Sequence, residues 1–137
     1  MSATRRLLAA TIAALTLLPA AAVVAAPRNG LWTAQTADST IKLLVERHRV
    51  VAVLVDAAPD APTHPDVRCD RQLYALLGPF GGTNTSTPKR FALRSEDGLS
   101  IIGSFQKQKL VGGFELGLGR YPCVKAGQRF VATRTTR

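Results

Sequence analysis

The segment 99–116 alternates between apolar residues and polar or small ones, and this period of two constrains the fold more than any other feature of the chain. Such alternation places successive side chains on opposite faces of a β-strand, so that one face meets a core and the other meets solvent. The polar run Gln106-Lys107-Gln108 divides the segment into two strands. The segment therefore predicts an antiparallel hairpin whose inner face carries Leu99, Ile101, Gly103, Phe105, Leu110, Gly112, Phe114 and Leu116.

Similar but shorter runs occur on both sides of this hairpin. The first three are expected to form a meander, and no run has the period of an amphipathic helix. The chain is therefore predicted to be all-β, with seven or eight short antiparallel strands that form a small barrel or sandwich. The further strands are expected at 31–36, 41–45, 50–55, 91–93 and 129–134, and at 72–77, where one short helical turn is the alternative.

Glycines and prolines refine this prediction. Gly103, Gly112 and Gly113 lie inside predicted strands, where glycine marks a bend or a close approach of the backbone, and this favours a barrel over a flat sandwich. Prolines recur at every third position within 57–67, and 78–88 is rich in glycine. Both segments are predicted to be long loops.

The first 26 residues have the layout of a secretory signal peptide. Arg5 and Arg6 precede an apolar stretch that ends near Pro19, and small residues follow. We expect cleavage within 22–26, which leaves 27–137 as a single β-domain that is secreted or periplasmic and has no membrane span. The alternative is an uncleaved anchor helix, since 20 apolar residues span about 30 Å.

Cys69 and Cys123 are the only cysteines of the chain. An even count in an exported chain predicts one disulfide between them. The alternative is a pair of reactive thiols, but the sequence has no C-x-x-C motif and no histidine close to either cysteine.

The net charge is +9, and it is +7 without Arg5 and Arg6. This balance favours acidic partners such as envelope polymers, anionic headgroups or acidic proteins.

Arg47 and Arg49 flank one predicted hairpin tip, and Lys107 and Lys109 flank another. If both tips lie at one end of the fold, these four residues form a cationic rim for a polyanion; dispersed surface charge is the alternative. Nucleic acid is not favoured, because the aromatic residues occupy core positions of the predicted strands.

Few residues suggest chemistry. His64 lies near Asp60 and Asp66, which makes these three residues weak candidates for a metal site, with solvated loop carboxylates as the alternative. His48 lies between two arginines, which disfavour metal binding. No nucleophile motif and no phosphate-binding glycine loop is present. We therefore expect no enzyme activity, no metal and no cofactor.

Several short motifs occur together in the mature part: Gly30-Leu31-Trp32 at its start, 101–105 with the pattern I-x-G-x-F, Gly112-Gly113-Phe114, and the two cysteines. In this combination the chain resembles a loose group of small exported bacterial β-domains. Ala34 stands where the group often has glycine, and Phe130 stands where it often has tryptophan. The resemblance implies an exported β-fold and supplies no catalytic residues.

These observations together predict an exported, non-catalytic β-domain. Its expected partner is an anionic envelope component or another exported protein. Two alternatives stay open. A barrel could carry a small molecule, or the loops 59–65 or 78–88 could inhibit an exported hydrolase.

Overall fold

The computed structural model describes residues 27–62, 65–66, 68–117 and 123–135, and within them it is all-β. None of the described residues belongs to a helix long and apolar enough to cross a membrane. The described strands, in chain order, are β1 (Gly30–Gln35), β2 (Ser39–Glu46), β3 (Arg49–Ala57), β4 (Ala61–Pro62), β5 (Gln72–Leu77), β6 (Thr85–Ser86), β7 (Arg90–Arg94), β8 (Ser100–Gln106), β9 (Lys109–Leu116) and β10 (Cys123–Arg134).

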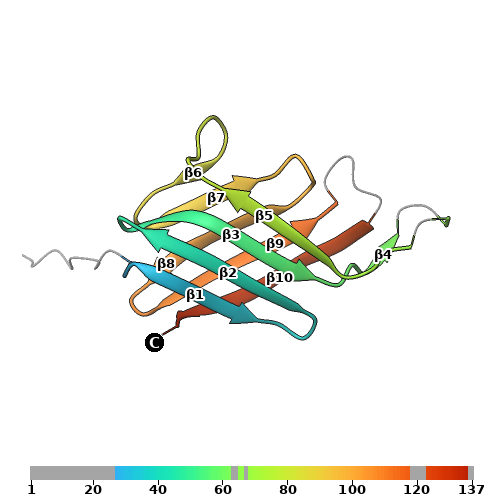
Figure 1. Cartoon of the computed structure of the whole chain (residues 1–137). Coiled ribbons are helices and arrows are strands. Elements are labelled where there is room, and N and C mark those ends of the chain that lie inside the picture. Colours follow the sequence, from blue (N-terminus) through green and yellow to red (C-terminus); the bar gives the residue numbers. More distant parts are fainter. Residues whose placement is uncertain (1–26, 63–64, 67, 118–122, 136–137) are drawn as a thin grey trace, which may run out of the picture.

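One antiparallel sheet contains nine of these strands in the order β5-β3-β2-β1-β10-β9-β8-β7-β6, and β4 pairs separately with β10. The predicted meander of the first three strands and the predicted β8–β9 hairpin are both confirmed. The first strand joins the last, because Trp32 lies opposite Arg134. The sheet curls into a half-barrel, so that β1, β2, β3 and β5 face β7, β8, β9 and β10 (Figure 1).

The core fills the space between these two halves. On β1 and β2 alternate residues are buried, among them Trp32, Ile41 and Leu43. The Trp32 and Phe105 rings meet edge to face across the interior, with centroids 5.4 Å apart. Burial of such side chains removes apolar surface from water, at about 25 cal/mol per Å2, and drives the curling of the sheet.

The structure contains more strands than predicted. The additional strands, β4 and β6, have two residues each and lie in the segments predicted to be long loops. Such short strands carry no periodicity, and they form because a partner strand lies beside them. The segment 72–77 is a strand, not a helical turn.

The last strand is also longer than predicted, since β10 begins at Cys123. A bulge between Lys125 and Gln128 interrupts the alternation of buried and exposed residues, so the sequence pattern does not reveal this extension. Before the bulge Cys123 and Lys125 are buried, whereas after it the buried residues are Phe130 and Ala132. The extra residue at the bulge changes which face the alternate side chains occupy.

Candidate functional site

The β2–β3 tip is a tight turn formed by Arg47 and His48. Both residues have positive φ, 49° and 63°, as a two-residue hairpin turn of this hand requires. The segment before β1 supports the turn, because the backbone N–H of His48 donates to Asn29 Oδ1 at 2.9 Å and the His48 ring Nδ1 donates to the carbonyl of Pro27 at 2.7 Å. The Nδ1 atom of His48 is therefore already hydrogen-bonded within the fold, whereas the flanking Arg47 and Arg49 are exposed.

The β8–β9 tip is also a two-residue turn, but only its first residue has positive φ. Gln106 lies opposite Lys109, which leaves Lys107 and Gln108 as the turn, and Lys107 has a φ of 51°. Lys107 and Lys109 are both exposed.

Sheet register places the two tips at the same end of the molecule. Val45 of β2 lies opposite Gly30 at the start of β1, and the start of β1 lies beside the end of β10. Thr133, near the end of β10, lies opposite Lys109. The hairpins 46–49 and 106–109 therefore share one end of the half-barrel, as Figure 1 also shows. The geometric condition for the predicted rim is met for Arg47, Arg49, Lys107 and Lys109.

Further bases that were not assigned to the rim from the sequence lie at the same end. Arg90 at the start of β7 lies opposite Ser104 near the end of β8, and the carbonyl of Lys89 accepts the N–H of Phe105 at 2.9 Å. We call this region the cationic end. It consists of Arg28, Arg47, Arg49, Lys89, Arg90, Lys107, Lys109 and Arg134, all of them exposed.

The charges of the cationic end are not neutralised within the described part of the chain. Glu46 is the one acidic residue there, and it forms no ion pair although it lies opposite Arg49. The described ion pairs belong to Arg71 and Lys125, at the other end. Positive charges that share one end of a protein raise the positive potential there and attract anions.

The opposite end of the half-barrel is acidic, and we call it the acidic end. It also carries bases, including Arg71 and Lys125. Apart from Glu46, it contains or adjoins every acidic residue of the chain: Asp38, Asp56, Asp60, Asp66, Asp70, Glu96, Asp97 and Glu115.

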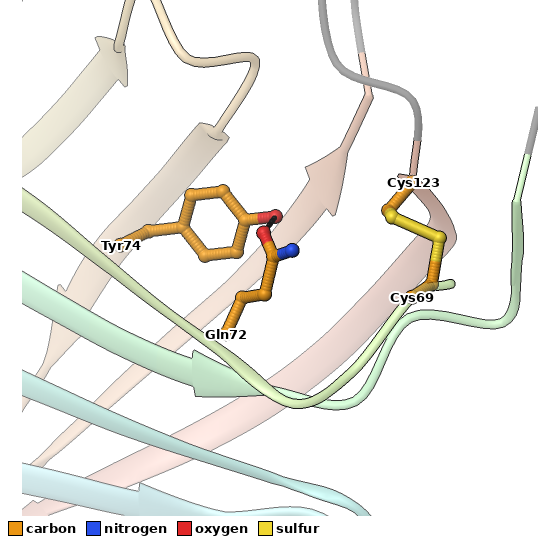
Figure 2. Close-up of a disulfide and its surroundings, with 4 residues drawn as sticks. All are labelled: Cys69, Gln72, Tyr74 and Cys123. Carbon is orange, nitrogen blue, oxygen red and sulfur yellow. Dashed lines mark hydrogen bonds between the residues drawn. A yellow bond between two sulfur atoms is a disulfide. The ribbon is translucent and has the colours of Figure 1, made fainter. Parts of the chain in front are cut away.

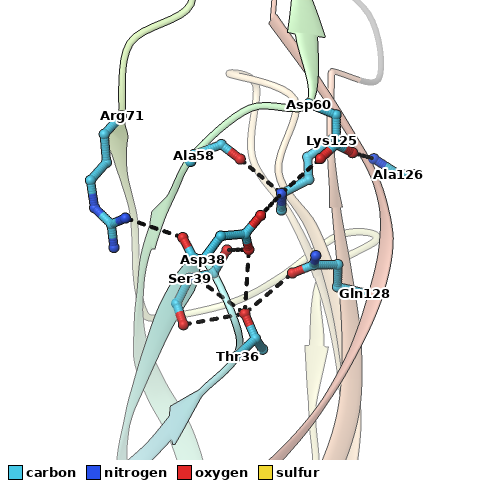
Figure 3. A network of polar contacts seen from close by, with 9 residues as sticks. All are labelled: Thr36, Asp38, Ser39, Ala58, Asp60, Arg71, Lys125, Ala126 and Gln128. Carbon is cyan, nitrogen blue, oxygen red and sulfur yellow. Dashed lines mark hydrogen bonds and ion pairs between the residues drawn. The ribbon is translucent and has the colours of Figure 1, made fainter.

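A buried lysine organises part of the acidic end (Figure 3). The side chain of Lys125 is fully buried, and its Nζ donates to Asp38 Oδ2 at 2.7 Å, to the carbonyl of Ala58 at 2.8 Å and to Asp60 Oδ1 at 2.9 Å. The second oxygen of Asp60 accepts the N–H of Ala126 at 2.8 Å. All three ammonium protons are thus used, as burial of a charge requires.

These contacts shift the pKa values of all three groups. The hydrogen bond from Lys125 lowers the pKa of Asp38, and Ser39 adds to the effect. The same lysine, followed by the Ala126 N–H, lowers the pKa of Asp60. Burial acts to lower the pKa of Lys125, but its hydrogen bonds to Asp38 and Asp60 outweigh burial and raise it. The network therefore stabilises the charged forms and ties the β1–β2 turn and the 58–60 segment to β10.

Sequence reasoning missed this network. Lys125 is one base among many, and it occupies an inward strand position only because the bulge follows it. The available signal was the Ala126-Gly127 pair after Cys123, since small residues within a strand are typical of a bulge.

The predicted disulfide is confirmed. Cys69 and Cys123 are bonded, with their Cα atoms 5.7 Å apart (Figure 2). The bond closes a sequence separation of 54 residues and attaches the segment before β5 to the start of β10. Next to it, Tyr74 Oη donates to Gln72 Oε1 at 3.0 Å. The reactive-thiol alternative does not apply, because neither cysteine is free.

The three weak candidates for a metal site, Asp60, His64 and Asp66, were predicted from their proximity in the sequence. The carboxylate oxygens of Asp60 are engaged by Lys125 and Ala126. Asp66 is exposed, and His64 lies outside the described residues. Among the described residues, no group of three or more His, Cys, Asp or Glu side chains is placed to hold a metal ion.

Shallow hollows lie on the outer face of the sheet over β7 to β10. Ile102, Gly113 and Arg129 line two of them, and Arg90 lines one of these two. A third hollow adjoins them through Ile102 and Ser100. These hollows are open to solvent and lie outside the packed interior.

No protein family, curated protein or solved structure was found to match this chain. The resemblance to small exported β-domains therefore stays a prediction, and function has to be inferred from the geometry described above.

Proposed function

We propose that this protein is an exported, non-catalytic binding domain that holds an anionic polymer of the cell envelope at its cationic end. The observation that carries the proposal is the meeting of two basic hairpin tips at one end of the half-barrel, with Glu46 as the one acidic residue beside them.

The form of the cationic end supports a polymer as the ligand. Its bases come from separate segments of the chain, and all of them are exposed. These segments are the one before β1, the two hairpin tips, the start of β7 and the end of β10. Dispersed point charges of this kind contact repeated anionic groups along a chain, whereas a single small anion needs donors that converge on one point.

The rest of the fold supports a surface site. Large side chains such as Trp32, Phe91 and Phe105 occupy the interior that a small-molecule carrier would use. A disulfide suits an oxidising compartment such as the periplasm or the exterior.

The test is a titration of fluorescently labelled poly-L-glutamate at several salt concentrations. Wild-type affinity should fall steeply as salt rises, because each charge contact releases counterions and is screened. The K107E/K109E variant should bind at least tenfold more weakly and show a shallower dependence on salt.

The matched control is K42E/R94E, which reverses the same number of exposed positive charges outside the cationic end. This variant should keep most of the wild-type affinity. Equal losses in both double variants would mean that net charge alone governs binding, and the proposal would then be wrong.

A further inference from the structure

Among the described residues, no strand pairs with the outer edge of β5. Within the described residues β5 pairs with β3 alone and stands at the end of the sheet order. Its six residues, QLYALL, include no charged residue and no proline. Proteins usually protect an edge strand with lysine, proline, a bulge or a short length, because its free N–H and C=O groups pair readily with another strand. The other end of the sheet has such protection, since β6 has only two residues.

The outer face of β5 is also apolar. Tyr74 is buried and Leu76 packs against the core, so Leu73, Ala75 and Leu77 face outward. Leu73 is 64% exposed and Leu77 is 77% exposed. An open edge and two exposed leucines on one strand indicate a surface that a further strand would cover.

The strand is complementary to itself. In an antiparallel pair of two β5 strands centred on Ala75, each Leu73 lies opposite Leu77 of the second copy, and Ala75 lies opposite its own counterpart. Both leucine pairs then share one face, where cross-strand apolar contacts are favourable. Neither strand carries a charged residue, so the pairing brings no like charges together.

The charge distribution complements the same arrangement. Leu77 lies opposite Ala52 near the start of β3, toward the cationic end, and Gln72 lies opposite Ala57, toward the acidic end. A two-fold axis through Ala75 reverses this direction in the second copy. The cationic end of each copy then lies beside the acidic end of the other, and the two attract each other.

We propose that β5 is a dimerisation strand: a second copy of this chain pairs antiparallel with it, centred on Ala75, and continues the sheet across a two-fold axis. The pairing does not depend on the proposed binding of a polyanion.

The first experiment is sedimentation velocity on protein expressed from the full-length sequence, over a range of concentrations and at two salt concentrations. Wild-type protein should form a dimer whose dissociation constant rises with salt. L73K/L77K should be monomeric, since it places lysines opposite lysines, with a dissociation constant raised at least tenfold. Retention of the disulfide in intact mass and an unchanged near-ultraviolet circular dichroism spectrum check that this variant is folded.

The matched control is I102K/V131K, which replaces two other exposed apolar side chains with lysine and should still dimerise. A wild-type protein that stays monomeric at every concentration overturns the proposal. So does a dimer that persists in L73K/L77K, or one that only I102K/V131K disrupts, because the interface would then lie elsewhere.

A second experiment tests the register. Under mild oxidation, A75C should form a disulfide-linked dimer in non-reducing intact mass, because the proposed axis places the two copies of residue 75 opposite each other. A92C, at another exposed alanine, serves as its control. Equal crosslinking of the two variants would contradict the centring on Ala75.

Discussion

Gly103 and Gly112 lie directly opposite each other on β8 and β9, at inward positions of the sheet. A Cβ atom at Gly103 would lie 2.6 Å from the Phe91 ring, and one at Gly112 would overlap the Ile102 carbonyl and lie 2.7 Å from the Phe130 ring. The two phenylalanine rings therefore take the place of the missing side chains. A side chain at either position would displace one of these rings from the core.

A first prediction follows from this pair. Gly112→Ala should lower the free energy of unfolding by about 1–3 kcal/mol, because the added methyl group meets backbone and a packed ring. Urea unfolding followed by tryptophan fluorescence measures the change. Gly81→Ala is the control, since no atom lies within 4 Å of a Cβ there, and its stability should stay close to that of the wild type. Equal stability of the two variants would show that the core tolerates a side chain at Gly112.

A second prediction concerns acid unfolding. Because the folded pKa values of Asp38 and Asp60 lie below their ordinary value of 3.8, the stability that they contribute is complete above that value and is lost as the pH falls through the folded values. Lys125→Met should reduce this dependence, because it removes the largest cause of both shifts, and should leave a flatter stability profile between about pH 2 and 5. Urea midpoints at successive pH values measure the profile.

At alkaline pH the contribution of Lys125 to stability changes in the opposite direction, because it is lost as the pH rises. The pKa of Lys125 lies above its ordinary value of 10.5, so its contribution is complete below 10.5 and is lost as the pH rises through the folded value. Lys42→Met, at an exposed lysine, should keep the wild-type profile at both extremes. An acid profile of Lys125→Met that parallels that of the wild type would count against the network as its source.

A third prediction concerns the disulfide. Replacing both cysteines, as Cys69→Ala with Cys123→Ala, should lower the free energy of unfolding by up to about 4 kcal/mol, because the unfolded chain loses a constraint across its loop. A reducing agent should destabilise the wild type to a similar extent and leave the double variant unchanged. If reduction leaves the unfolding midpoint of the wild type unchanged, the bond adds no stability.

A fourth prediction separates stability from binding at a hairpin tip. Arg47 adopts a φ of 49°, which asparagine tolerates better, and it lies among other cations. Arg47→Asn should therefore raise the free energy of unfolding by about 0.5 kcal/mol while weakening the binding of poly-L-glutamate. Lys42→Asn removes the same charge from the middle of β2 and should not weaken binding. A loss of stability in Arg47→Asn would mean that the arginine side chain supports the turn.

Sequence patterning was sufficient for the longer strands. Ile101, Phe105, Leu110 and Phe114 occupy the buried positions that their alternation predicted. The period of two is a local property, so it can be recognised wherever a strand is long and one face meets the core. It failed at β4, at β6 and before the bulge of β10, where a short or interrupted strand leaves no period to recognise.

The disulfide, the rim and the Lys125 network also differ in how far the sequence could predict them. The disulfide could be predicted because the chain has only two cysteines. The rim could be stated only as a condition, since no local pattern tells whether the tips at 46–49 and 106–109 share an end. The network of Lys125 could not be predicted, because Asp38 and Asp60 reach the lysine from distant parts of the chain.

The sequence alone was enough to assign an all-β domain, its main strands, the Cys69–Cys123 bond and the inward side chains, because these depend on neighbouring residues or on a single possible pairing. The pairing of β1 with β10, the separation of a cationic end from an acidic end and the burial of Lys125 were decided by the tertiary structure. Each of these depends on the order of strands in the curled sheet, and that order is set by the packing of the whole core.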